Sequence, residues 1–193
     1  IVPVVMKGSK GEEVFAEDER PMDTTLEKML QMKPAFGKDG TVTAASSSSI
    51  SDGAAAIVLM SESAARAAGL KPLARLVSYA SHAQAPEWFT TAPAPSMQKA
   101  LDRAGWKVAE VDLFEINEAF ACVAMAAMQD LGLRHDQLNV NGGACAMGHP
   151  VGATGARIIT TLLHALRKRG LRRGVASQCI GGGEACAVAI ELL

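Results

Sequence analysis

The sequence has few cysteines, few aromatic residues and no long hydrophobic run, and these absences exclude several classes of protein. Its four cysteines lack the Cys-x-x-Cys spacing of structural zinc sites and are too few for a disulfide framework. We therefore expect a reducing compartment, the cytoplasm, and no metal site. No apolar run approaches the roughly 18 residues that cross a bilayer, and no leader-like segment opens the sequence, so we expect no membrane partner.

An excess of charge of either sign is also missing. The chain has 19 Lys and Arg against 20 Asp and Glu, and its basic residues gather only at 167–169 and 172–173, where a helix end favours cations. We therefore expect no nucleic-acid partner. The sequence does have 49% hydrophobic residues over 193 positions, which is enough to bury a core and predicts a globular protein.

Apolar spacing predicts alternating helices and strands after about residue 71. The last two strands flank three glycines, so we expect them to form a hairpin, and Gly132 is expected to end a helix. Such alternation predicts a sheet covered by helices, which is an α/β fold. The expected helices lie at 97–104, 120–128 and 158–166, and the expected strands at 72–80, 111–116, 138–141, 175–180 and 185–192.

The first 70 residues follow a less regular pattern. A strand is expected at 1–5, Asp23 is the expected N-cap of a short helix, and Ser61 is expected to cap another. A serine-rich loop, 40–52, leads to 54–60, which is apolar throughout and predicts a central strand. Because too little chain precedes it to supply neighbouring strands, we expect its sheet partners, and the start of the polypeptide, to lie outside this sequence.

Three segments place polar side chains where α/β proteins hold their sites. The first, Asn117-Glu118-Ala119-Phe120, stands at the junction of an apolar strand and an apolar helix. Junctions of this kind, at the carboxyl ends of strands, carry ligands and catalytic groups in many α/β proteins. Taken alone, Asn117 is equally well explained as the N-cap of its helix. This segment by itself therefore leaves both interpretations open.

The second and third segments are rich in glycine, which allows a ligand or another backbone to approach closely. His149 stands in the middle of 141–155, where His and Pro replace the Lys and Ser/Thr of a phosphate-binding P-loop and so exclude that motif. The third segment, Cys179-Ile180-Gly181-Gly182-Gly183, puts a thiol at the end of a strand, before N–H groups that could line an anion-binding nest. The alternative for Cys179 is a buried structural thiol.

Together these three segments resemble the motifs of the thiolase family, the acetyl-CoA acetyltransferases in particular, in their order and spacing. The likeness extends to Gly40-Thr41-Val42-Thr43-Ala44 and Asp52-Gly53-Ala54-Ala55-Ala56, which resemble the loop before the last strand of the N-terminal domain of that family. It therefore covers nearly the whole chain.

The resemblance implies a fold and a division into domains. Thiolases have a layered α-β-α-β-α fold of two similar halves, each with a mixed sheet, and this chain would contain the C-terminal half plus the end of the N-terminal half. Residues 1–38 would end the substrate-covering loop region. Residues 39–70 would supply the last strand and helix of the N-terminal domain, and 71–193 the C-terminal domain.

The resemblance also implies a mechanism, in which two acetyl-CoA molecules condense or a 3-ketoacyl-CoA is cleaved through a covalent acyl-enzyme. His149 would activate a nucleophilic cysteine and then help to hold the thioester oxygen, with a water positioned by Asn117 as the second donor. Cys179 would be the acid/base that moves the α-proton of the second thioester, and its thiolate would need stabilisation. The N–H of Gly181 would serve a second oxyanion hole.

Coenzyme A and acyl-CoA would be substrates, with no permanently bound cofactor. Ser48 would contact the pantetheine arm, and Arg20 would reach the CoA phosphates. The other residues expected along the same tunnel are Ala44, Ser47, Ala119 and Phe120. Two departures from the family pattern are the serine-rich stretch 46–49 and the residues that follow the triple glycine, Glu184 and Cys186.

The nucleophilic cysteine of thiolases belongs to the N-terminal half, and no cysteine here replaces it. We expect Cys122, Cys145 and Cys186 to pack in the core, and we expect this chain alone to be inactive. The resemblance implies that the N-terminal half is its partner and that the complete enzyme is a homodimer or homotetramer.

Two other functions share parts of this pattern with a thiolase. A ketoacyl-synthase-type condensing enzyme shares the fold but uses a histidine pair or His/Asn and lacks the second cysteine that Cys179 provides. A non-catalytic thiolase-like lipid-binding module typically replaces the asparagine that is kept here as Asn117.

Overall fold

The computed structural model describes residues 1–9, 11–19 and 24–193, and its centre is a mixed four-stranded sheet. The strands lie in the order β3 (Ala74–Ala83), β6 (Glu184–Leu192), β5 (Arg173–Cys179) and β4 (Leu113–Ile116). β4 and β5 are parallel, and the other pairs are antiparallel. The predicted hairpin of the last two strands is confirmed.

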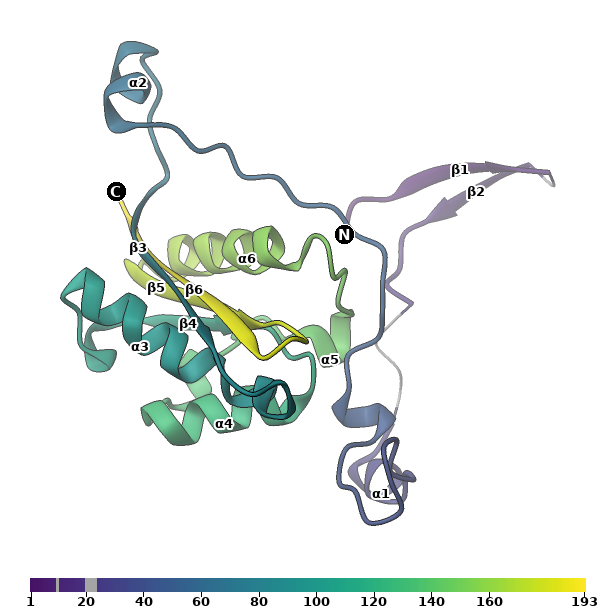
Figure 1. Ribbon diagram of the computed structural model, residues 1–193. Coiled ribbons are helices and arrows are strands. Elements are labelled where there is room, and N and C mark those ends of the chain that lie inside the picture. Colours follow the sequence, from purple (N-terminus) through teal and green to yellow (C-terminus); the bar gives the residue numbers. More distant parts are fainter. Residues whose placement is uncertain (10, 20–23) are drawn as a thin grey trace.

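Helices cover both faces of this sheet (Figure 1). On one face α3 (Pro93–Ala104) and α4 (Ala121–Leu131) pack over the sheet and bury Leu101, Phe114 and Val123 completely. On the other face α6 (Thr154–Arg169) buries Leu162 against the sheet. Each such side chain stabilises the fold by roughly 1.5–3 kcal/mol. The expected α/β class is thus confirmed, with this chain forming one mixed sheet between two helical layers.

The helix signals read from the sequence agree well with the structure in this part of the chain. The helical spacing at 97–104 falls inside α3, and the spacing at 158–166 falls inside α6. Gly132 ends α4 with a left-handed backbone at φ 66°, a conformation that glycine adopts without steric cost. Short elements complete this region: the 3₁₀ turns η2 (Pro86–Thr91), η3 (Val108–Glu110) and η4 (His135–Gln137), and helix α5 (Ala144–Met147).

Most of the N-terminal 70 residues extend away from the sheet (Figure 1), whereas residues 47–50 contact residues 119, 120 and 149. The predicted first strand begins later, as β1 (Val4–Gly8), and pairs with β2 (Gly11–Phe15) in an exposed hairpin. Helix α1 (Leu26–Leu30) is capped by Thr25; the expected cap Asp23 lies outside the described residues. The 3₁₀ turn η1 (Ala44–Ser46) follows, and Ser61 caps α2 (Glu62–Ala67) as predicted.

Two predicted strands are wrong. Residues 54–60 are extended but belong to no strand, and Val58 and Leu59 are 82% and 73% exposed. A strand exists only through hydrogen bonds to a neighbour, and no described strand pairs with this segment. Residues 138–141 contribute only isolated bridges, such as Phe114 with Leu138, because the chain turns at Asn139, where φ is 47°.

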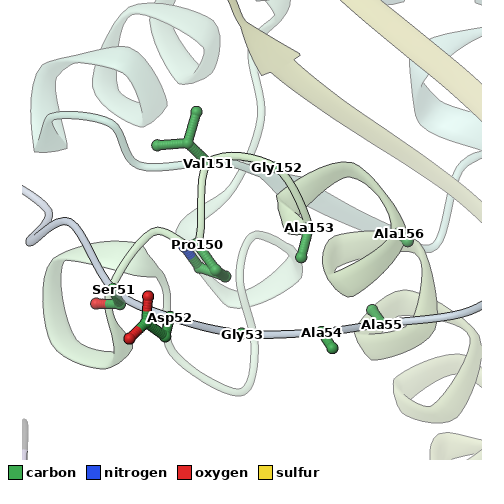
Figure 2. A pocket seen from close by; sticks show the side chains of 10 residues that line it. All are labelled: Ser51, Asp52, Gly53, Ala54, Ala55, Pro150, Val151, Gly152, Ala153 and Ala156. Carbon is green, nitrogen blue, oxygen red and sulfur yellow. The ribbon is translucent and has the colours of Figure 1, made fainter.

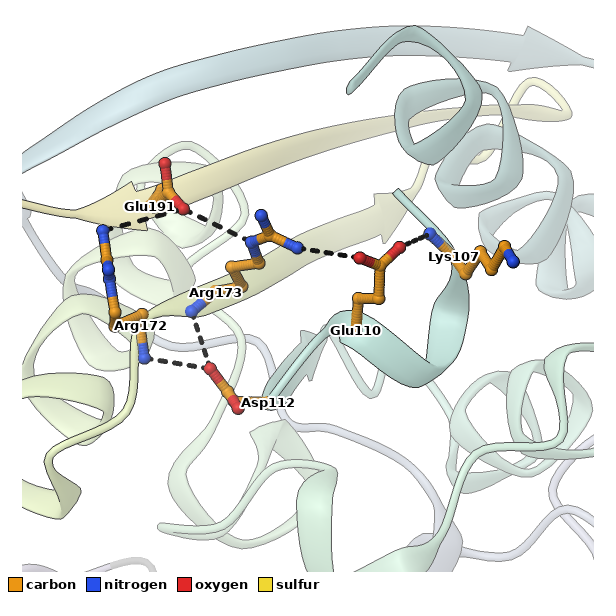
Figure 3. A network of polar contacts seen from close by, with 6 residues as sticks. All are labelled: Lys107, Glu110, Asp112, Arg172, Arg173 and Glu191. Carbon is orange, nitrogen blue, oxygen red and sulfur yellow. Dashed lines mark hydrogen bonds and ion pairs between the residues drawn. The ribbon is translucent and has the colours of Figure 1, made fainter. Parts of the chain in front are cut away.

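A network of ion pairs and hydrogen bonds joins the amino ends of β4 and β5 to the preceding turn η3 and to Glu191 at the end of β6 (Figure 3). The Arg173 guanidinium contacts Glu110 at 3.2 Å and Glu191 at 3.3 Å, and lies over the Trp106 ring at 4.6 Å. The Asp112 carboxylate accepts the N–H groups of residues 172 and 173 at 2.9 and 2.8 Å. This end of the sheet is therefore fixed by charge, and the opposite, carboxyl end holds the predicted site.

Candidate functional site

Asn117 directly follows β4 and is completely buried. Its backbone N–H donates to the Ser177 carbonyl at 2.9 Å, so it continues the pairing of β4 with β5 beyond the end of the strand. Its side-chain amide lies 3.3 Å from Nε2 of His149, whereas its Oδ1 has no hydrogen-bond partner in the described chain. Asn117 is not the N-cap of α4, because Phe120 holds that position. The alternative interpretation of Asn117 is therefore wrong.

His149 is held on three sides. Its backbone N–H donates to the Ser49 carbonyl at 2.8 Å, and its Nδ1 lies 2.6 Å from the Thr154 hydroxyl. The amide nitrogen of Asn117 can only donate, so Nε2 accepts from it and carries no proton. Nδ1 therefore carries the imidazole proton and donates it to the Thr154 hydroxyl. This tautomer is the one that a general base at Nε2 requires.

The surroundings of His149 favour its neutral form. Burial lowers the pKa of the imidazole below its usual range, and the positive charge of Arg157 lowers it further. A neutral imidazole at physiological pH can accept a proton from a thiol. The Asn117–His149–Thr154 group is thus arranged for proton transfer. Thr154 was missed at the sequence level, although a hydroxyl at the start of a helix that follows a glycine-rich loop was the available signal.

Cys179 is buried at the carboxyl end of β5, the strand beside β4, two residues beyond Ser177. Burial raises the pKa of its thiol to about 11. The thiolate stabilisation that a base would need is therefore not supplied by the described residues. Gly181 lies in the exposed turn between β5 and β6, which is closed by the Gly183 N–H donating to the Ile180 carbonyl at 3.1 Å.

The four predicted catalytic residues thus lie at one end of the sheet, but only two of them touch. Asn117 and His149 are in contact, whereas Cys179 and Gly181 follow the neighbouring strand and make no hydrogen bond to either of them among the described residues.

Glu118, a member of the first motif, has a structural role that the sequence did not predict. Its carboxylate accepts from the Asn139 amide at 2.8 Å and from the Cys145 N–H at 3.2 Å. A Cβ on Gly143 would lie 2.2 Å or less from this carboxylate, so a side chain at 143 would push the carboxylate out of these hydrogen bonds. Glu118 therefore clamps the segment before His149 onto the end of β4.

The residues predicted to line the CoA tunnel are brought together from two distant segments. The Ser48 hydroxyl donates to the Ala119 carbonyl at 3.0 Å, and Ser47 forms an isolated antiparallel β-bridge with Phe120. The Phe120 ring packs edge-on against Phe36, with ring centres 5.7 Å apart. The remaining members are Ala44, which is exposed at the start of η1, and Arg20, which lies outside the described residues.

A shallow cavity of about 350 Å³ opens beside this group, between residues 51–55 and the loop after His149 (Figure 2). Its wall is made of small side chains, and a Cβ on Gly53 would lie 2.8 Å from Pro150. None of the four predicted catalytic residues lines it. The cavity is thus a neighbour of the site, and no group of three or more His, Cys, Asp or Glu that could hold a metal occurs in the described residues.

The exposure of the other cysteines differs from the prediction. Cys186 is exposed, because on β6 the alternating residues Ala185 and Ala187 face the core and Cys186 falls on the opposite face, beside Ser81. Cys122 and Cys145 are half-buried. Burial, together with the nearby Glu118 charge, raises the pKa of Cys145 to about 12, which makes this thiol unreactive.

The fold and the Asn117–His149 pair define a member of the thiolase family. The family model for the thiolase C-terminal domain matches residues 70–192, and the model for the thiolase N-terminal domain matches residues 1–63. These two matches together cover nearly the whole sequence, and they show that the chain belongs to the thiolase family.

Named relatives are similar over the whole chain. The acetyl-CoA acetyltransferase of Escherichia coli is 52% identical over 194 residues, and that of Shinella zoogloeoides is 50% identical over 194 residues. These alignments cover 100% of this chain and 49% and 50% of the respective relatives. The chain therefore spans about half the length of the curated relatives that it matches.

Solved structures of thiolases are similar to this chain as well. The acetyl-CoA acetyltransferase of Bacillus anthracis matches with a TM-score of 0.94 at 47% identity, covering 100% of this chain and 49% of that one. Human mitochondrial 3-ketoacyl-CoA thiolase matches with a TM-score of 0.88 at 38% identity, covering 99% and 49%. The same human enzyme in complex with CoA matches with a TM-score of 0.85 over 94% of this chain and 46% of that one. No helix among the described residues is long and apolar enough to cross a membrane.

Proposed function

We propose that this chain supplies the C-terminal catalytic groups of an acetyl-CoA acetyltransferase. The observation that carries the proposal is the contact between Asn117 and Nε2 of His149, with the imidazole proton kept on Nδ1 by Thr154. The relatives named acetyl-CoA acetyltransferase, about half identical over the whole chain, favour this activity. Retention of both Asn117 and Cys179 favours it over a lipid-binding module and over a ketoacyl synthase.

In the proposed mechanism, Nε2 of His149 takes the proton from a cysteine supplied by the N-terminal half. That thiolate attacks the thioester carbon of an acyl-CoA and displaces the CoA thiolate, so that the acyl group remains on the cysteine. The resulting Nε2–H then donates to the thioester oxygen as negative charge develops on it. Asn117 holds a water as the second donor of this oxyanion hole. The buried position of Asn117 supports this role, because a fixed amide needs no rearrangement as the charge appears.

In the second half-reaction, Cys179 removes the α-proton of an acetyl-CoA, or returns it during cleavage, while the N–H of Gly181 holds the developing oxyanion. The thiol of Cys179, with its pKa raised to about 11 by burial, needs a lower pKa for this step. Substrate binding and the N-terminal half would supply this by bringing N–H donors and the His149 imidazole close to the sulfur.

Substrate, partners and domains are part of the same proposal. The pantetheine arm of CoA would run past Ser48, beside Ala44, Ser47, Ala119 and Phe120, and Arg20 would contact the CoA phosphates. No permanently bound cofactor is required. The domains would divide as 1–38, 39–70 and 71–193.

The N-terminal half would cover the exposed segment 54–60 with its own strands, and the complete enzyme would form a homodimer or homotetramer. The four unpaired cysteines support a reducing compartment, which we propose to be the cytoplasm.

The test is thiolysis of acetoacetyl-CoA by this chain, alone and mixed with an N-terminal half that carries the nucleophilic cysteine. We expect activity only in the mixture, and we expect Cys179→Ala to abolish it while the exposed-cysteine control Cys186→Ala retains it. Activity of this chain alone, or activity that does not depend on Cys179, would refute the proposal.

A further inference from the structure

A second polar pair joins β4 to α6, the two elements that lie next to Asn117 and His149 in the sequence. The Glu115 carboxylate on β4 lies 4.0 Å from the Arg157 guanidinium on α6, with side-chain exposures of 2% and 21%. Glu115 and Asn117 are two residues apart on an extended chain and so share a face, whereas Thr154 and Arg157 are one helical turn apart. The pair therefore links the strand before Asn117 to the helix that carries Thr154.

The Glu115–Arg157 pair leaves some of its hydrogen-bonding atoms without partners. Oε1 of Glu115 and Nη1 of Arg157 have no hydrogen-bond partner in the described chain, and 4.0 Å is too long for a strong hydrogen bond. A buried ion pair with unmet hydrogen-bonding groups costs desolvation energy that its attraction does not fully repay. An apolar pair of the same size would stabilise the fold at least as well. Stability alone therefore does not explain the pair.

We propose that Glu115 and Arg157 are positioning residues for His149: they join the strand that carries Asn117 to the helix that carries Thr154, and they fix a guanidinium charge near the imidazole. The proposal rests on the proposed role of His149 as a base. It adds two residues to the site that touch neither substrate nor nucleophile.

The charges around the pair support this role. Arg157 is the charged group that acts on His149, and its positive charge opposes a second positive charge on the imidazole, which lowers the pKa of His149. The charged groups that act on Arg157 are the carboxylates of Glu115 and Glu118. Burial raises the pKa of Glu115 to about 7, although the charge of Arg157 opposes this rise.

The experiment is an NMR titration of the His149 imidazole in this chain, which needs no enzymatic activity. Arg157→Met should raise the pKa of His149, Arg157→Lys should leave it near that of the unmodified chain, and Glu115→Gln should not raise it. The control Arg167→Met removes an exposed charge from the far end of the same helix and should have no effect. Circular dichroism and the amide spectrum check folding, and Arg157→Gln replaces Arg157→Met if the latter unfolds.

The result separates a charge effect from a loss of packing. If the variants only loosened the packing, water would reach His149 in each of them and its pKa would rise in each. A rise in the His149 pKa that is equal in Glu115→Gln and Arg157→Met would therefore overturn the proposal. An unchanged His149 pKa in Arg157→Met would also overturn it. The thiolysis assay tests the proposed function separately, because His149 titrates in this chain whether or not the mixture of the two halves is active.

Discussion

The amide of Asn117 and Nε2 of His149 are 3.3 Å apart although the two residues are 32 positions apart in sequence. Two fixed supports create this contact: the end of β4 for Asn117, and the Thr154 hydroxyl with the Ser49 carbonyl for His149. A site built on a strand end and a helix start holds its groups rigidly, which oxyanion stabilisation requires.

Asn117→Ala should therefore damage catalysis far more than folding. Loss of one oxyanion-hole donor typically lowers kcat by about 10²-fold or more. We expect such a fall in the thiolysis rate of the reconstituted protein, with KM little changed, because the water held by Asn117 acts mainly in the transition state. The exposed Gln98→Ala serves as the control. A kcat within threefold of the unmodified protein would contradict the role given to Asn117.

Thr154→Val should disturb the tautomer of His149. The valine removes the acceptor for the Nδ1 proton and so leaves a buried N–H group without a partner, at a cost of about 1–3 kcal/mol in the free energy of unfolding. Nitrogen-15 NMR of the imidazole should show the proton partly moved to Nε2. Thr154→Ser keeps the hydroxyl and should restore the original tautomer. Identical imidazole spectra in the valine variant and the unmodified chain would disprove the assignment.

The cysteines should react with iodoacetamide in an order that follows exposure and thiol pKa. Cys186 is exposed and should be alkylated first at pH 7.5, whereas burial raises the pKa of Cys179 to about 11 and that of Cys145 to about 12. Raising the pH to about 9 should speed the reaction of Cys179. Peptide mass spectrometry after timed alkylation gives the order, and rapid labelling of Cys179 at pH 7.5 would show that its thiolate is already stabilised in this chain.

The stability of the chain should fall as the pH rises toward neutrality, through Glu115. Burial raises the pKa of Glu115 from 4.5 to about 7, so between these values the folded chain binds a proton that the unfolded chain has released. This contribution is complete below about pH 4.5 and is lost as the pH rises through about 7, with an upper limit on the order of 3 kcal/mol.

Glu115→Gln should remove this dependence, and the exposed Glu87→Gln should retain it. Urea unfolding at pH 5 and pH 8 measures the difference. A difference that is the same in the Glu115→Gln variant and the unmodified chain would show that another group is responsible.

Much of this architecture could be predicted because the signals are local. The apolar spacing that places α3 and α6, the glycine that ends α4 and the serine that caps α2 act within one or two helical turns. The errors arose where structure depends on distant partners. Residues 54–60 have the composition of a central strand but pair with no other strand in the part of the chain that the structure describes, and Cys186 faces outward because of the alternation along β6.

The candidate site, like the fold, could be predicted only in part from the sequence. The motifs located Asn117, His149 and Cys179, but they did not predict the side-chain contacts that support these residues. Thr154 binds His149 from the next helix, Glu118 clamps the preceding segment, and Glu115 meets Arg157 across two elements. Such contacts depend on how β4 and α6 pack, which spacing along one chain does not specify.

The central claim is that His149 and Cys179 act in different half-reactions, and acetylation of the reconstituted protein tests it most directly. After incubation with acetyl-CoA, intact mass spectrometry of both chains shows where the acetyl group resides. We expect Cys179→Ala to accumulate acetyl on the N-terminal half without forming acetoacetyl-CoA, and His149→Ala to accumulate none. Acetyl found on this chain, or acetylation that persists without His149, would contradict the account.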